Sequence, residues 1–126
     1  MHDWIAETMR AYGLNIGIEN LMLDADGGIE LEMDGGECLG IQRLSNAPGD
    51  ELLVYWGRRL NFDPGPQLER ALRMINGRQG LAWPAQAAVR DDMLIMTMRL
   101  PASSFELPAL EGVINQLEGM QAEAAG

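Results

Sequence analysis

The sequence predicts an α+β protein in which helices pack on an antiparallel sheet. Short segments of alternating apolar and polar residues, separated by Gly-, Asp- and Pro-rich turns, are typical of strands joined in hairpins. Three further segments carry apolar residues at the spacing of a helix face. The order is helix, three strands, helix, two strands, helix. Strands joined by short turns pair antiparallel, and each helix must bury its apolar face, so we expect the helices to cover the sheet.

The first expected helix begins after Asp3, a favourable N-cap, and ends at Gly13. Residues 14–20 then form a connector, and the pattern leaves open whether residues 21–23 add a brief strand. The apolar face of this helix comprises Trp4, Ile5, Thr8, Met9 and Tyr12.

The first two strands are expected to form a hairpin. Residues 29–33 alternate strictly between apolar and acidic side chains, and the Asp-Gly-Gly sequence at 34–36 is a hairpin turn signal. Residues 37–44 return as the second strand. Within that strand Gly40 indicates a bulge or the close approach of another group.

A turn at residues 45–49 leads to a third strand at 51–56, and the Pro- and Gly-rich segment 61–66 ends it. The period then changes, because a helix is expected from Gln67 to Gly77. Its apolar stripe, at i, i+3, i+4 and i+7, comprises Leu68, Ala71, Leu72 and Ile75.

The last third of the chain reads as two strands and a helix. Residues 80–89 are extended, and Pro84 favours a sheet edge for this segment. Residues 93–100 form the most apolar strand. A final helix follows with Pro108 in its first turn, and residues 121–126 are expected to fray. The core stripe of this helix is Leu110, Val113, Ile114 and Leu117.

The length of 126 residues allows one core, so we expect a single domain over residues 1–126. No apolar run approaches the roughly 20 residues that a membrane span needs. The N-terminus lacks a signal-type apolar block, which favours a cytoplasmic protein without membrane insertion. A lone cysteine, Cys38, fits a reducing compartment.

The formal net charge is −10, and residues 1–37 carry nine acidic groups against one arginine, Arg10. A field of this sign repels phosphate groups, which disfavours nucleic acid and anionic membranes as partners. The acidic surface serves solubility, or it keeps an otherwise sticky protein monodisperse.

The sequence offers no pattern that supports catalysis, a metal ion or a cofactor. The only histidine, His2, lies at the terminus, so a nucleophile–histidine pair has no support. Residues 24–28 resemble a calcium loop only faintly and are interpreted as a tight turn. Acids near Cys38 raise the pKa of a thiol, which argues against a nucleophile. The acids of the hairpin, interpreted as a solvated face, are Glu30, Glu32 and Glu37.

Nine methionines are a high number for this length. Methionine fills irregular gaps in a core, and it also lines surfaces that accept varied apolar partners. Both interpretations stay open at this point.

Several local sequences, in this order of elements, resemble the class I type III secretion chaperones, the Tir-chaperone-like family. They are Tyr-Gly-Leu at 12–14, Leu-Asp-Ala-Asp-Gly-Gly at 23–28, Leu-Arg-Met-Ile-Asn-Gly at 72–77 and a Leu/Val/Ile-rich final helix after Leu100-Pro101. The small size and the pI of about 4.3 also agree. The resemblance is diffuse but covers nearly the whole chain.

The resemblance implies a homodimer that meets through the middle helix and the strand after it. An alternative is that the same helix stripe faces only its own sheet. The implied dimer interface comprises Leu68, Ala71, Leu72, Ile75 and Trp83.

The resemblance also implies a partner, the N-terminal segment of a secreted effector bound in a non-globular state, and no enzymatic activity. Apolar grooves would take side chains of the extended segment, a free sheet edge could add a strand of it, and an acidic rim of Glu30, Glu32 and Glu37 could steer basic segments. The expected effector-binding residues are Trp4, Ile5, Met9, Leu31, Met33, Leu39 and Ile41.

Two other classes of function remain open on the sequence: a small-ligand-binding α+β protein (or an enzyme with an unrecognised site), and an adaptor that binds a folded partner outside secretion. An enclosed pocket with convergent polar groups favours the first, whereas exposed apolar grooves favour a chaperone.

Overall fold

A computed structural model describes residues 3–45, 50–77 and 80–126. The predicted α+β class and order of elements are confirmed, with five strands in one antiparallel sheet of order β1-β2-β3-β5-β4. Most of the predicted turn at 45–49 lies outside the described residues. The strands are β1 (Gly28–Glu32), β2 (Cys38–Leu44), β3 (Glu51–Arg59), β4 (Ala85–Arg90) and β5 (Met93–Pro101). The helices are α1 (Trp4–Asn15), α2 (Pro64–Gly77) and α3 (Leu107–Ala125), with short 3-10 turns η1 (Asp34–Gly36) and η2 (Ala102–Ser104).

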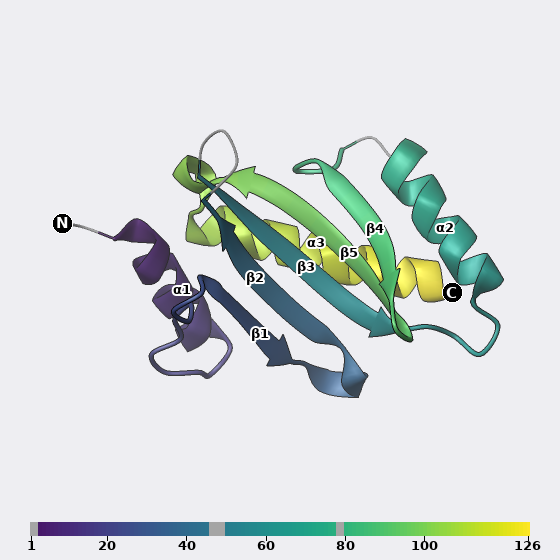
Figure 1. Cartoon of the computed structure of the whole chain (residues 1–126), viewed down its shortest axis with the longest axis horizontal. Helices are drawn as coiled ribbons and strands as arrows, with labels where there is room; N and C mark the ends of the chain where they lie inside the picture. The colour runs from purple at the N-terminus through teal and green to yellow at the C-terminus, as the bar shows by residue number, and fades with distance from the viewer. Residues whose placement is uncertain (1–2, 46–49, 78–79) are drawn as a thin grey trace.

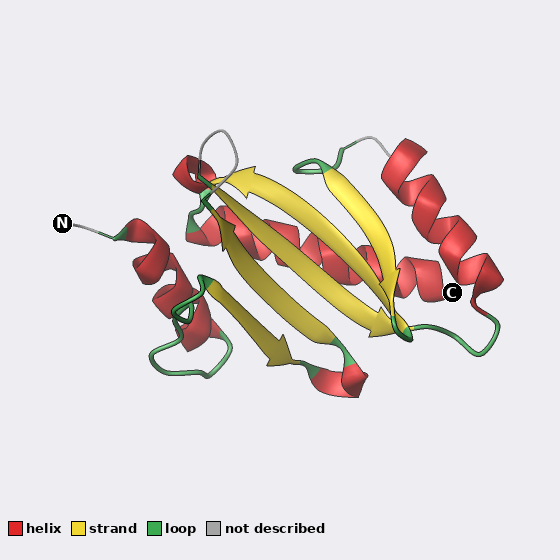
Figure 2. Cartoon of the chain, viewed as in Figure 1, coloured by secondary structure: helices red, strands yellow, loops and turns green. Residues whose placement is uncertain are grey.

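The helices leave one face of the sheet open. Figure 1 shows α3 crossing behind the sheet, with α1 beyond the β1 side and α2 beside β4. None of the described helices lies on the face turned to the viewer, and the same arrangement is visible by element type in Figure 2. We call the face that carries α3 the inner face and the opposite one the outer face.

The core lies between the inner face and α3. Val54 of β3 stands opposite Ile41 of β2 and Met98 of β5, and all three side chains are buried. Such cross-strand rows stabilise a sheet when a helix covers them. On the helix side of the core, the expected stripe of α3 is buried as predicted: Leu110, Val113, Ile114 and Leu117.

Helix α1 starts where the sequence predicts, because Asp3 Oδ1 accepts hydrogen bonds from the backbone N–H groups of Ile5 and Ala6, each at 3.1 Å. It does not end at Gly13 but runs on to Asn15. Gly13 is buried, and a Cβ there would lie 2.6 Å from Cβ of Leu21. The glycine therefore permits close packing of the returning chain and does not act as a stop.

Helix α2 begins at Pro64, earlier than the predicted Gln67, since proline is well tolerated in a first turn. Its buried residues are Gln67, Ala71 and Met74. The predicted stripe is thus rotated: of its four members only Ala71 is buried. The other three, Leu68, Leu72 and Ile75, are half-buried or exposed.

The C-terminal segment does not fray as expected, because α3 continues to Ala125. Gln121 is fully buried and donates through Nε2 to the backbone oxygens of Trp56 and Leu94, each at 2.8 Å. Arg70 of α2 donates through Nε to the Ala124 oxygen at 2.8 Å. These bonds fasten the end of α3 to the sheet and to α2.

Gly40 allows a close approach, as one of the two sequence interpretations expected. The ring of Tyr55 on β3 lies over Gly40 of β2, and a Cβ at Gly40 would be 1.8 Å from Cζ of that ring. The phenol oxygen of Tyr55 donates to Glu30 Oε2 of β1 at 2.9 Å. One aromatic side chain therefore spans three strands on the outer face.

We predict that Gly40→Ala destabilises the protein by about 1–3 kcal/mol, because the added methyl displaces the Tyr55 ring from a packed position. The matched control is Gly112→Ala in α3, where a Cβ would meet nothing within 4 Å. That control should gain about 0.5–1 kcal/mol through helix propensity. Urea denaturation measures both, and an unchanged midpoint for Gly40→Ala would contradict the packing described.

Candidate functional site

Helix α1 is flanked by two open hollows. One, of about 500 Å3, separates α1 from the segment that leads into β1, and its lining includes Ile5, Ala6 and Met22. The other, of about 510 Å3, separates α1 from η2 and the start of α3, and its lining includes Trp4 and Phe105. Apolar and polar side chains share the lining of both hollows, so α1 offers some apolar surface on two sides.

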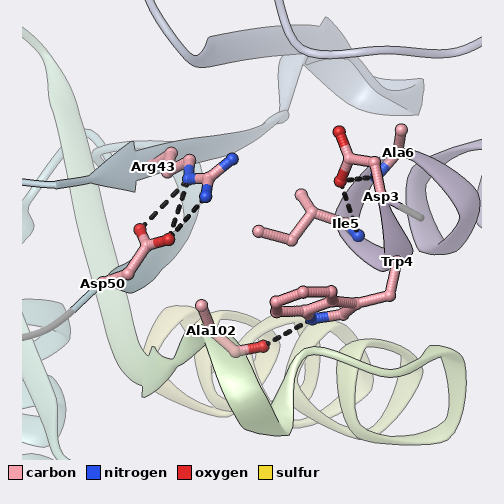
Figure 3. A network of polar contacts seen from close by, with 7 residues as sticks. All are labelled: Asp3, Trp4, Ile5, Ala6, Arg43, Asp50 and Ala102. Atoms are coloured by element: carbon pink, nitrogen blue, oxygen red, sulfur yellow. Dashed lines mark hydrogen bonds and ion pairs between the residues drawn. The ribbon is translucent and has the colours of Figure 1, made fainter. Parts of the chain in front are cut away.

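Trp4 is the most prominent apolar group beside these hollows. Its side chain is 46% exposed, although Trp4 Nε1 donates to the backbone oxygen of Ala102 at 3.0 Å (Figure 3). The bond fixes the indole across the space between α1 and η2. A large aromatic ring that is held in place but left half in solvent is the kind of residue that anchors protein–protein contacts.

The same region contains a well-formed ion pair that holds β2 to β3. Arg43 donates through Nε to Asp50 Oδ1 at 3.1 Å, and its Nη2 contacts Oδ2 of the same carboxylate (Figure 3). The Arg43 bond lowers the pKa of Asp50, which keeps the carboxylate charged. Arg43 also lines the hollow between α1 and β1.

Strand β1 is an edge strand that pairs only with β2 among the described residues. Its Leu31 lies on the inner face, and Leu31 and the following Met33 are half-buried against the core, whereas Glu30 and Glu32 are exposed. An edge strand with incompletely covered apolar groups presents both backbone hydrogen-bonding groups and apolar surface to another chain.

The expected effector-binding residues fall into two groups. Trp4, Leu31 and Met33 are exposed or half-buried at the α1–β1 side of the molecule. The others are buried in the core and are not accessible in this conformation, so a contact between them and a partner stays a prediction. These buried residues are Ile5, Met9, Leu39 and Ile41.

The expected dimer residues lie at the opposite end. Leu72 of α2 is 55% exposed, and Val89 of β4, which was not among the predicted residues, is 50% exposed beside it. Between α2 and β4 lies a small apolar hollow of about 200 Å3, to which Leu68 and Ala71 contribute. Ile75 and Trp83 are half-buried against the core. We call this region the α2–β4 surface; β4 is the second edge of the sheet, as Pro84 indicated.

The outer face carries an open hollow of about 590 Å3 whose lining extends from β1 to the turn between β4 and β5. Glu30, Tyr55 and Cys38 line it. Burial, and next the hydrogen bond to Glu30, raise the pKa of Tyr55 to about 12, so the phenol remains a hydrogen-bond donor at neutral pH. Burial, followed by the charge of Glu30, raises the pKa of the Cys38 thiol, which agrees with the expectation that it is a poor nucleophile.

Sequence reasoning missed four exposed apolar residues around the connector after α1. Leu14 and Met22 are more than half exposed, and Ile16 and Ile18 are about one-third exposed. The available signal was the apolar character of Leu14, Ile16 and Ile18 in the predicted connector and of Met22 in the segment left open as a brief strand. They extend the apolar surface beside α1.

Within the described ranges, no group of three or more His, Cys, Asp or Glu side chains is arranged to hold a metal ion. The described helices also include none that is long and apolar enough to cross a membrane.

No protein-family model and no curated protein matches the chain. Solved structures do match it. A chain in the crystal structure of the Yersinia pestis type III secretion chaperone SycH, in complex with a stable fragment of YscM2, has a TM-score of 0.72 and 16% identity; the match covers 95% of this chain and 98% of that chain.

Two further solved structures match the fold over nearly the whole chain. A chain in the HopA1–SchA chaperone–effector complex matches with a TM-score of 0.69 and 13% identity over 94% of this chain and 91% of that one. A chain in the ExoU–SpcU heterodimeric complex from the type III secretion system of Pseudomonas aeruginosa matches with a TM-score of 0.65 and 18% identity, over 96% and 94%. At these identities the likeness establishes the fold: the chain has the fold found in structures of type III secretion chaperones.

Proposed function

We propose that the protein is a type III secretion chaperone of the class I, Tir-chaperone-like kind. It binds the non-globular N-terminal segment of a secreted effector, keeps that segment soluble and competent for export, and has no catalytic activity of its own. It acts in the bacterial cytoplasm as a homodimer, and residues 1–126 work as one domain. The fold shared with chains from chaperone–effector complexes supports this proposal.

The observation that carries the proposal is the half-covered apolar edge beside α1. Trp4 stands half exposed between α1 and η2, and on the nearby edge strand β1 the side chains of Leu31 and Met33 are only half-buried. An extended segment can place apolar side chains against these groups and add backbone hydrogen bonds to the free edge. Because ordering a disordered segment costs entropy, such a partner must cover a wide surface, and the two hollows beside α1 extend that surface.

Dimerisation uses the α2–β4 surface. An apolar helix side next to a free strand edge is a combination that a second copy can cover by a two-fold contact, in which the same patch meets itself. Leu72 and Val89 are central to this patch because they are the large apolar residues left exposed on it. Covering them places the two α1–β1 surfaces at the outer ends of the dimer.

We expect a purified complex when the protein is co-expressed with the N-terminal segment of an effector encoded beside it. Trp4→Ala should weaken retention of that segment by roughly thirtyfold, the loss of about 2 kcal/mol typical of an aromatic anchor. The control is Phe62→Ser, which removes a fully exposed aromatic ring on the loop before α2. Retention of no neighbouring secreted protein by the unmodified chain would refute the chaperone function.

Light scattering on the purified protein should give the mass of a dimer, and Leu72→Asp should give a monomer. The substitution puts an uncompensated charge into the centre of the proposed contact, where it must be buried without a partner. Leu14→Asp, at a leucine near the end of α1 that is slightly more exposed than Leu72, serves as the control and should remain dimeric. A monomeric unmodified protein, or a dimeric Leu72→Asp variant, would contradict the α2–β4 interface.

A further inference from the structure

The backbone hydrogen-bonding groups of β1 point alternately toward β2 and toward the free edge of the sheet. At the hairpin end, Met33 N donates to Glu37 O of the neighbouring chain segment at 2.8 Å. Antiparallel strands exchange hydrogen bonds at alternate residues, so the odd-numbered residues of β1 bond to β2. The backbone N–H and C=O groups of Glu30 and Glu32 consequently point away from the sheet, toward any strand that is added.

The side chains of β1 also alternate, with acidic groups on one face of the sheet and apolar groups on the other. Glu30 and Glu32 lie on the outer face and are exposed, while Ile29 and Leu31 lie on the inner face and are half-buried. The hydrogen bond from Tyr55 holds the Glu30 carboxylate in place on the outer face. A strand added to this edge would therefore meet two carboxylates on one face and apolar side chains on the other.

We propose that this edge selects a segment in which basic and apolar residues alternate. The inference rests on the proposed function and names the chemistry of the segment that the α1–β1 surface accepts. Its basic residues stand opposite Glu30 and Glu32, where opposite charges on paired strands attract. Its apolar residues stand opposite Ile29, Leu31 and Met33. The preferred pattern is apolar, basic, apolar, basic, apolar, the complement of residues 29–33.

Charge also argues against the other occupant of a free edge, a second copy of β1. Pairing two such strands would set glutamates opposite glutamates on one face, which is destabilising. Cations do line the outer-face hollow, but at its far side: Arg90 lies at the end of β4, and Arg59 of β3 is paired with Asp92 at 2.7 Å. The β1 side of the hollow remains acidic.

Three fluorescein-labelled peptides with identical Ser/Gly flanks test the pattern by fluorescence anisotropy. Their central sequences are Val-Arg-Leu-Arg-Val, the acidic Val-Glu-Leu-Glu-Val and the rearranged Val-Leu-Arg-Arg-Val. The alternating basic peptide should bind about fivefold more tightly than the other two, since exposed charge pairs contribute modestly, and 1 M salt should remove most of the difference. Equal affinities, or no binding of the alternating basic peptide, overturn the proposal.

Backbone methylation of the basic peptide tests the strand pairing itself. Methyl groups on the backbone nitrogens of the two arginines block one edge of the peptide strand. Methyl groups on the backbone nitrogens of the apolar residues block the other edge. Only one of the two patterns should abolish binding: the arginine pattern if the added strand is antiparallel, and the apolar pattern if it is parallel. Similar loss from both patterns, or from neither, would rule out edge pairing.

The matched protein variants are Glu30→Gln with Glu32→Gln, and Glu111→Gln with Glu118→Gln on α3, which removes the same charge elsewhere. Only the first pair should abolish the preference for the basic peptide, because a glutamine at position 30 can still accept the Tyr55 hydrogen bond. Suppose that the β1 double variant and the unmodified protein retain a co-expressed effector segment equally well, and that neither prefers the basic peptide. The chaperone function then stands, and the proposed selection for basic residues is wrong. If the unmodified protein retains no segment, both fail.

Discussion

One constraint shapes the molecule: a single long helix must cover a sheet that is wider than the helix. Strands lie about 4.8 Å apart, and a helix with its side chains is about 10–12 Å across, so one helix covers two or three strands. Helix α3 contacts β3 and β5, the central strands with the most completely buried side chains. The edge strand β4 packs against α2, whereas α1 packs mainly on α3 and lies beside β1, so both edges keep half-buried or exposed apolar side chains. The apolar surface left at the two edges is a direct consequence.

Polar contacts keep this arrangement fixed while the edges remain open. Gln121 joins α3 to the backbone of β3 and β5 in the interior, and Arg70 joins α2 to the last turn of α3. On the outer face Tyr55 ties the β1 edge to the centre of the sheet through Glu30. The two buried bonds of Gln121 Nε2, together with the more exposed bonds of Arg70 and Tyr55, favour one packing of the helices on the sheet. The exposed apolar residues therefore belong to a rigid frame, which lowers the entropic cost of binding a flexible partner.

Local chemistry made much of the fold predictable from the sequence. Asp3 has a capping side chain, residues 29–33 have a period of two, and Pro84 cannot take part in a central strand, so each indicated its own structure. What the sequence could not supply was the direction of each apolar residue relative to tertiary neighbours. Trp4 and Ile5 are adjacent in one helix, yet Trp4 is exposed and Ile5 is in the core. The sequence wrongly predicted fraying at the end of α3 because the burial of Gln121 depends on strands that are distant in sequence.

Whether the uncovered edge beside α1 receives an extended polypeptide is tested most directly by hydrogen exchange measured with mass spectrometry. The protein is compared alone and in complex with a co-expressed effector segment. Slower exchange should appear in β1 and α1 of the complex, since an added strand protects edge amides. Exchange in α2 and β4, which the proposed dimer already covers, should stay unchanged. Protection confined to the α2–β4 surface or to the middle of the outer face, with β1 exchanging as in the free protein, would contradict the central claim.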